Sequence, residues 1–142
     1  MASVSAIRAQ IASDLTGISA LTSAFPDGYR VSAYPVSNPT PPQLEIAQFG
    51  IQKHQSMTGG STAEWWTVIV RAYLAVTSDS ESLKIADSFL ASDPVTAAIE
   101  ADRTLNGQVS DLIVDRADQR FWDHPQLRSV LAGVEWQLRI LL

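Results

Sequence analysis

The sequence predicts an α+β fold: a single small domain in which a mainly antiparallel or mixed β-sheet is packed by an N-terminal helix and two central helices. Residues 64–76 are rich in β-branched and aromatic side chains, which suit a half-buried strand. Residues 3–15 and 78–91 repeat apolar side chains at helical spacing. Residues 131–141 alternate apolar and polar side chains, as in a strand with one dry face. The length of 142 residues predicts one domain with a real core.

The chain opens with the expected helix at 3–15, for which Ser3 is the predicted cap and Gly17 the predicted stop. Ile18 and Leu21 are expected to continue its apolar contacts in a looser turn. The helix has one apolar stripe, which comprises Val4, Ile7, Ile11 and Leu15.

Two short strands are expected next, separated by a stiff connector. The turn at Asp27-Gly28 leads into a strand at 29–34. Prolines then punctuate 35–42, which excludes a helix or a central strand there. The second strand, 44–49, is expected to alternate in two sets, with Leu44, Ile46 and Gln48 on one face and Glu45, Ala47 and Phe49 on the other.

A polar stretch at 50–63 is longer than a hairpin needs, so it is either a functional projection or a disordered loop. The strand at 64–76 follows. Its one interior charge is Arg71, which favours a central place in the sheet.

Both central helices carry start signals. Ser78 and Glu81 have the spacing of a capping box, in which each side chain satisfies a backbone N–H of the first turn. The shorter helix has Asp93 at its N-cap and Pro94 at its first position.

The last third of the sequence predicts a hairpin. Asn106-Gly107 forms a tight turn into a strand at 109–115. That strand is expected to pair with 131–141, and the charged segment 117–129 is expected to form a long hairpin tip.

Composition excludes several classes of partner and site. The net charge is 10 − 15 = −5, which argues against a nucleic-acid groove or an anionic membrane as the main partner. The chain has no cysteine, so disulfides and thiolate metal sites are excluded. No run approaches the ~18 apolar residues of a membrane span, and polar residues interrupt the N-terminal apolar positions. We expect a soluble protein made in the cytoplasm.

The search for chemistry predicts no catalytic, cofactor-binding or metal-binding residue. The histidines, His54 and His124, lie far apart in sequence, whereas zinc needs several converging ligands. Glu100 and Asp102 are two residues apart and therefore do not share a helix face. The Gly-Gly-Ser-Thr stretch at 59–62 lacks the lysine and the helix of a phosphate loop.

Trp65 and Trp66 are adjacent strand residues and must point to opposite faces of the sheet. Trp66 and the residues that alternate with it are expected to meet the helices. The face of Trp65, Ile69 and Tyr73 is too apolar to be left fully wet. Two interpretations remain open: a second layer of the domain covers that face, or another protein does.

Four segments, in this order, resemble the tail terminator proteins of long-tailed bacteriophages, also called tail completion or head–tail joining proteins. They are Pro41-Pro42 before the second strand, 93–99, the Leu-Asn-Gly-Gln-Val turn at 105–109, and the closing strand at 133–138. The order of elements resembles the family over nearly the whole chain.

The resemblance implies a structural protein rather than an enzyme. Members form rings, commonly hexamers, on the head-proximal end of the tail tube. The ring ends tube polymerisation and provides the joint to the head–neck connector, and DNA passes through its lumen without sequence-specific binding. The acidic net charge suits such a lumen, because neutralising phosphates is what creates tight non-specific binding. The resemblance implies a place in the virion neck, with no membrane, metal or cofactor.

With this family in view, the candidate contact residues lie on the 50–63 loop, the central strand and the expected hairpin tip. They are His54, Met57, Trp65, Trp66, Ile69, Tyr73, Phe121 and Trp122. The alternatives are another neck protein, a stopper or adaptor; a tail-assembly or baseplate subunit; and a small enzyme or ligand-binding domain whose site the sequence does not reveal.

Overall fold

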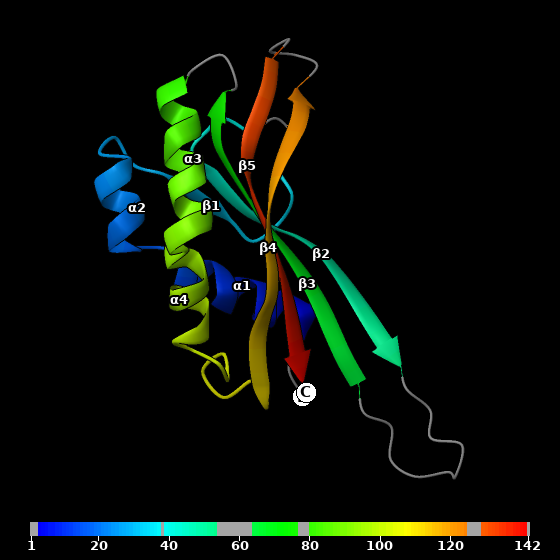
Figure 1. Cartoon of the computed structure of the whole chain (residues 1–142). Coiled ribbons are helices and arrows are strands. Elements are labelled where there is room, and N and C mark those ends of the chain that lie inside the picture. The colour runs from blue at the N-terminus through cyan, green and yellow to red at the C-terminus, as the bar shows by residue number, and fades with distance from the viewer. Residues whose placement is uncertain (1–2, 38, 54–63, 77–79, 125–128, 142) are drawn as a thin grey trace, which may run out of the picture.

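The computed structural model describes residues 3–37, 39–53, 64–76, 80–124 and 129–141 (Figure 1). The helices are α1 Val4–Leu15, α2 Ser19–Ala24, α3 Ser80–Ser92 and α4 Pro94–Glu100. The strands are β1 Arg30–Ser32, β2 Gln43–Lys53, β3 Glu64–Val76, β4 Asp111–His124 and β5 Ser129–Leu141. The chain is an α+β domain, as the sequence predicts.

The strands form one five-stranded sheet in the order β1-β2-β3-β5-β4. The β1–β2 pair is parallel and every other neighbouring pair is antiparallel. The expected central position of β3 is confirmed. The helices lie on one side of the sheet (Figure 1), and we call that side the helix face and the opposite side the open face. Among the described residues, no helix is long and apolar enough to span a membrane.

The core lies between the helices and the helix face. Alternate residues of β3 and β5 point into it because successive strand residues face opposite ways. Those of β5 have no exposed surface, as the alternation in the sequence predicts. The two strands contribute Trp66, Val68, Val70, Ala72, Val134, Trp136, Leu138 and Ile140.

The N-terminal helix begins and ends where the sequence predicts. Ser3 accepts a hydrogen bond from the Ala6 amide (3.1 Å), and Gly17 has a φ of 82°, which glycine adopts without strain. Three of the four stripe residues are buried, whereas Val4 is 36% exposed. The looser turn expected around Ile18 is wrong: it is a short helix, α2, whose Leu21 is buried.

The central helices follow the sequence closely. Asp93 caps α4 by accepting a hydrogen bond from the Thr96 amide (3.0 Å), and Pro94 lies in the first turn. The same carboxylate accepts a hydrogen bond from Nε1 of the buried Trp136 (3.0 Å), so the cap also ties α4 to the sheet. Helix α3 begins at Ser80, and the expected cap Ser78 lies outside the described residues.

The predicted alternation of the second strand is wrong beyond Ile46. A β-bulge at Ala47 shifts the register, so Gln48 pairs with Ile69 and Phe49 with Val68. A bulge adds one residue and reverses the facing of everything after it. Phe49 therefore lies on the helix face and Gln48 on the open face. Strand β2 also continues to Lys53, so 50–53 belong to the sheet rather than to the expected loop.

The predicted hairpin is confirmed, but its long tip is wrong. Strand β4 runs from Asp111 to His124, and its pairing with β5 extends to His124 and Ser129. The charged segment from Ala117 to His124 is therefore part of the paired strand rather than of the loop at the hairpin tip. A second bulge, at Asp115, again exchanges the faces.

Candidate interaction surface

The open face is the side of the sheet that, from the sequence, either a second layer of the domain or another protein covers. No helix of the described chain covers it, and only the proline connector crosses part of it. We divide it into an ion-pair row, an aromatic hollow beneath the connector and an apolar end.

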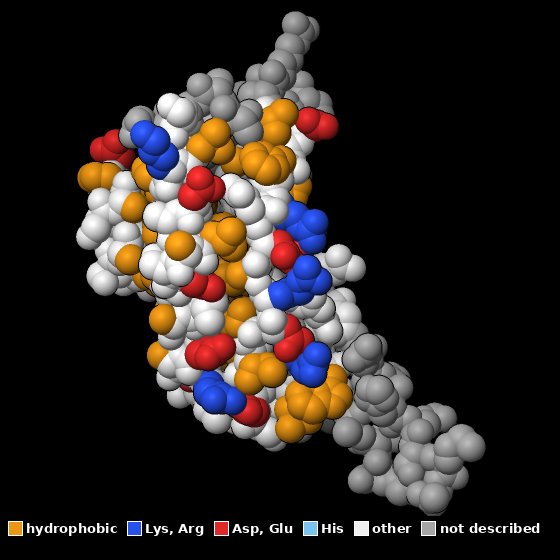
Figure 2. Space-filling model, viewed as in Figure 1, with side chains coloured by type: hydrophobic (Ala, Val, Ile, Leu, Met, Phe, Trp, Pro, Cys, Tyr) orange, Lys and Arg blue, Asp and Glu red, His pale blue; other side chains and the backbone are white. Residues whose placement is uncertain are grey.

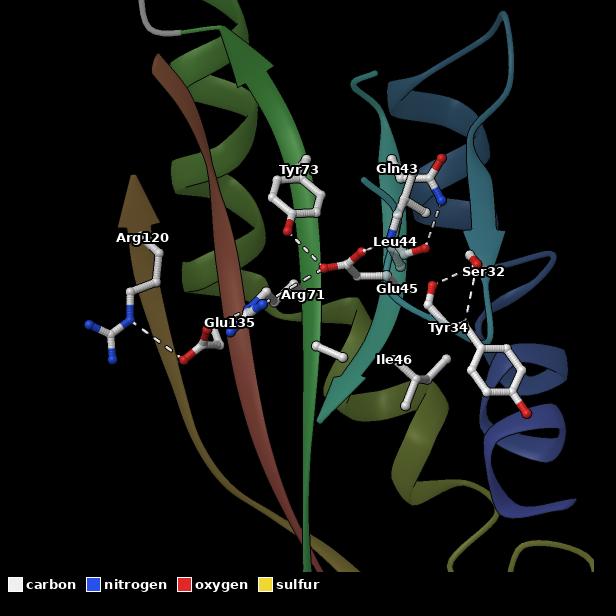
Figure 3. Close-up of polar contacts among 12 residues, drawn as sticks. Ser32, Tyr34, Gln43, Leu44, Glu45, Ile46, Arg71, Tyr73, Arg120 and Glu135 are labelled. Atoms are coloured by element: carbon white, nitrogen blue, oxygen red, sulfur yellow. Dashed lines mark hydrogen bonds and ion pairs between the residues drawn. The ribbon is translucent and has the colours of Figure 1, made fainter. Parts of the chain in front are cut away.

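The ion-pair row crosses four strands (Figure 3). Glu45 of β2 lies 3.9 Å from Arg71 of β3, and Nε of Arg71 donates to Glu135 of β5 at 2.9 Å. Arg120 of β4 lies 3.7 Å from the other oxygen of Glu135. Register produces the row, because Arg71 is the cross-strand partner of both Glu45 and Glu135. The row continues to Asp118, the register partner of Glu135.

Glu45 is only 1% exposed, so its carboxylate needs local partners. It accepts hydrogen bonds from the Tyr73 hydroxyl and from the Val36 amide, both at 2.7 Å. Burial, together with this carboxylate, raises the pKa of Tyr73 above its usual range. Burial acts to lower the pKa of Arg71, but the hydrogen bond and charge of Glu135 raise it overall. The tyrosine and the arginine therefore stay protonated as donors.

An aromatic hollow lies beside the row. Trp122 packs edge-on against Tyr73, with ring centroids 4.8 Å apart. Both rings lie beside Gly133, which is the register partner of Tyr73. A Cβ added to this glycine would lie 1.7 Å from the Ala72 carbonyl oxygen. No larger residue fits there. Connector residues Val36, Ser37 and Pro39, with Asp123 and Leu131, complete a hollow of about 170 Å³.

The apolar end of the open face lies at the opposite end of the strands. Trp65 and Ile69 of β3, Ile113 of β4 and Leu141 of β5 are all half-buried there. Register brings them to one face across three neighbouring strands. Arg139 borders the group, with its guanidinium 5.5 Å from the Trp65 ring centroid and 2.9 Å from Asp115. Charged side chains of both signs alternate down the strip over β4 in Figure 2, with hydrophobic side chains at its end.

The candidate contact residues separate into different environments. Trp66 is a core residue, 8% exposed and edge-on to Phe49, so it is the tryptophan that enters the core. Trp65, Ile69 and Tyr73 share the open face, as predicted, but Tyr73 is buried in the aromatic hollow at the other end of the strands from Trp65.

The remaining candidates do not form the expected tip. Trp122 packs on Tyr73 instead of projecting, whereas Phe121 is 58% exposed on the helix-face side of β4. His54 and Met57 lie outside the described residues. Sequence reasoning missed Glu45, because a glutamate in a short strand next to prolines carries no signal of burial.

Chemistry on the described surface is limited. No cluster of three or more histidine, aspartate or glutamate residues within the described ranges is placed to hold a metal ion. One carboxyl pair joins α1 to the end of α4: Gln10 Nε2 donates to Asp14 at 3.2 Å and to Asp102 at 3.1 Å. Burial, then the hydrogen bond and like charge of Asp102, raise the pKa of Asp14 from 3.8 to about 7.

No protein-family model matches the sequence, and no curated protein matches it significantly.

Proposed function

We propose that the protein is a structural virion component, a tail terminator. It forms a ring, expected to be a hexamer, that caps the head-proximal end of the phage tail tube. The ring ends tube polymerisation and provides the joint to the head–neck connector. The motif resemblance supplies this class of function, and the open face supplies the physical reason for assembly.

The observation that carries the proposal is the unequal covering of the sheet. One face is closed by helices, whereas the apolar end of the open face keeps Trp65, Ile69 and Ile113 half-buried with no second layer from the described chain. Half-exposed aromatic and aliphatic side chains grouped in this way are typical of protein contacts. Assembly with other subunits would complete their burial.

The charges on the open face support passage of DNA without adhesion. Four of its arginines each have a carboxylate within 4.0 Å: Arg71 and Arg120 have Glu135, Arg116 has Asp118, and Arg139 has Asp115. Tight non-specific binding requires arginine and lysine that are free to neutralise phosphates. Paired arginines in an acidic chain are poorly suited to that role.

The decisive test is electron microscopy of tails assembled without this protein. We expect overlong tubes, because nothing ends polymerisation. Purified protein added to isolated tubes should bind at one end as a ring and stop growth. Binding to DNA-filled heads instead of tubes would identify a stopper or adaptor. A chain that stays monomeric at high concentration and is inert toward tubes overturns the proposal.

A matched pair of variants links the activity to the open face. Ile69→Asp places a charge in the apolar end and should abolish ring formation and capping. Ser23→Asp adds the same charge on an exposed position of α2 and should leave both unchanged. Circular dichroism of both variants should match that of the unchanged protein. If Ile69→Asp caps tubes normally, the apolar end of the open face takes no part in assembly.

A further inference from the structure

We infer that the ring, if the proposed function holds, closes by strand addition between copies of this chain. Residues 116–121 of β4 in one copy pair antiparallel with residues 48–53 of β2 in the next. The partner is a second copy because the two unpaired edges belong to opposite ends of the same sheet. Such a contact is heterologous, the type that generates rings.

Each edge is blocked over one half and open over the other. On β2, β1 covers Gln43–Glu45, and Arg8 donates to the carbonyl oxygens of Ile46 (2.6 Å) and Ala47 (3.2 Å). From Gln48 onward, β2 has no described backbone partner on its outer side. Exposed edges of this kind are normally protected, since they invite pairing with another chain.

Strand β4 shows the same division. The Leu112 amide donates to the Asp111 carboxylate (2.9 Å), and the Val114 amide donates to Glu100 of α4 (3.3 Å). These amides therefore point away from β5. In an antiparallel ladder such outward groups recur on every second residue. The bulge at Asp115 shifts this alternation by one, so after it the outward groups belong to Ala117, Gln119 and Phe121. No described backbone group pairs with them.

Strand direction makes the two open halves compatible. The strands β2, β3, β5 and β4 alternate in direction, because each neighbouring pair is antiparallel. Their number is even, so an identically oriented second sheet presents its β2 antiparallel to the first copy's β4. Within one sheet Gly50 is level with Ile113 of β4, and Asp118 is level with Glu45 of β2, so the open halves lie at opposite ends of the strands. The second sheet is therefore displaced along the strands by about five residues, a stagger of the kind that tilted strands in closed barrels have. Repetition continues the alternation without reversing any subunit, and each added sheet buries one open half of each kind.

Exposed aromatic side chains accompany both open halves. Phe121, 58% exposed, is part of the open half of β4. Tyr34, 54% exposed, stacks on Arg8, whose guanidinium lies 4.8 Å from the ring centroids of both Tyr34 and Phe49 of β2. Apart from Val4, these are the large hydrophobic side chains exposed in the described chain. A protein that kept these edges free would gain nothing from placing aromatics there.

Introduced cysteines test the pairing, since the chain has none of its own. Gly50 lies on the open face, in the open half of β2, and a Cβ added there meets nothing within 4 Å. On the new ladder it would lie opposite Arg116, Asp118 or Arg120. Opposed residues on the non-hydrogen-bonded sites of antiparallel strands have Cα atoms ~4.5 Å apart, which is within disulfide range.

We expect Gly50→Cys combined with one of Arg116→Cys, Asp118→Cys or Arg120→Cys to form disulfides between copies after mild oxidation. A denaturing gel should then show a ladder of covalent oligomers up to the full ring. Reductant should return it to monomer on a denaturing gel. Each single cysteine, and Gly50→Cys with Ser23→Cys on α2, should give no oligomer beyond a dimer. Light scattering of the reduced samples verifies that every variant still forms the ring.

The outcomes separate this inference from the proposed function. Rings that cap tubes yet give no ladder with any of the three β4 cysteines overturn strand addition and leave the proposed function standing. A chain that neither forms rings nor caps tubes overturns both. A ladder without tube capping supports strand addition and overturns the tail-terminator role.

Discussion

The two faces of the sheet are built from the same strands but are buried to different extents. On the helix face, Trp136 and its neighbours in β5 have no exposed surface. On the open face of the same strand, Glu135 and Gln137 are half-buried and Arg139 is exposed. The helix face is a finished core. The open face is held in shape by ion pairs and one connector, and under the proposed function a partner supplies its remaining burial.

The largest effect should come from the helix face. Trp136→Ala removes a fully buried side chain and its hydrogen bond to Asp93. We expect a loss of about 3–5 kcal/mol in the free energy of unfolding. Urea denaturation measures it, with Gln137→Ala on the open face as the control. Equal losses for both would contradict the division into a finished and an unfinished face.

The next effect concerns the part of the open face that the proline connector covers. Tyr73→Phe removes a hydrogen-bond donor from the buried carboxylate of Glu45. Leaving a buried acceptor short of a donor costs about 1–3 kcal/mol. Tyr34→Phe, at an exposed tyrosine, is the control and should not change the denaturation midpoint. If Tyr73→Phe is neutral as well, water replaces the hydroxyl and solvent reaches this part of the open face.

A smaller, pH-dependent effect is expected at the rim of the helix layer. The folded protein holds a proton on Asp14 up to about pH 7, whereas the unfolded chain releases it near the ordinary value of 3.8. Stability from this group is therefore present at low pH and lost as the pH rises through 7. Because solvent reaches the pair, Asp14→Asn should add roughly 1 kcal/mol at pH 8.

Melting temperatures of this variant and the unchanged protein at pH 5 and pH 8 measure the effect. The two proteins should differ at pH 8 and converge at pH 5. Gln10→Ala serves as the comparison, because it removes the shared donor without changing the charge. A constant difference across this range would show that the carboxyl pair does not titrate as described.

The smallest effect on the monomer should come from the apolar end of the open face. Ile69→Thr keeps the β-branched shape of a half-buried strand residue, so the free energy of unfolding should change by less than about 1 kcal/mol. Ring formation should nevertheless weaken at least several-fold, measured as the shift in the concentration at which rings appear. A large loss of stability would place this residue in the monomer's own core.

The helix face could be predicted because its signals are local and periodic. The alternation of β5, the stripe of α1 and the Asp93-Pro94 start of α4 all follow from short-range patterns. Each depends on side chains a few residues apart. These elements agree with the structure nearly residue for residue.

The open face was harder because its determinants are distant in sequence. The bulge at Ala47 carries no pattern of its own, yet it moves Gln48 and Phe49 to opposite faces. The charged half of β4 resembles a loop until Glu135 of β5 is placed beside Asp118 and Arg120. Cross-strand pairing neutralises such charges, and one strand alone cannot show it.

Part of the candidate surface was nevertheless predictable. Strand alternation alone places Trp65, Ile69 and Tyr73 on one face and Trp66 on the other. What alternation cannot show is that the proline connector returns over Tyr73. Neither does it show that Glu45 is buried beneath that connector.

The position of β5 between β3 and β4 has a consequence for synthesis. Strand β4 precedes β5 in the chain but cannot pair with β3, because β5 lies between them. Until the ribosome has made and released residues 129–141, the edges of β3 and β4 that face β5 have no strand to pair with. The nascent chain therefore displays two long unsatisfied strands at once, the condition under which intermediates aggregate. Slow translation of residues 129–141 should lower the soluble yield more than slow translation of any segment before them.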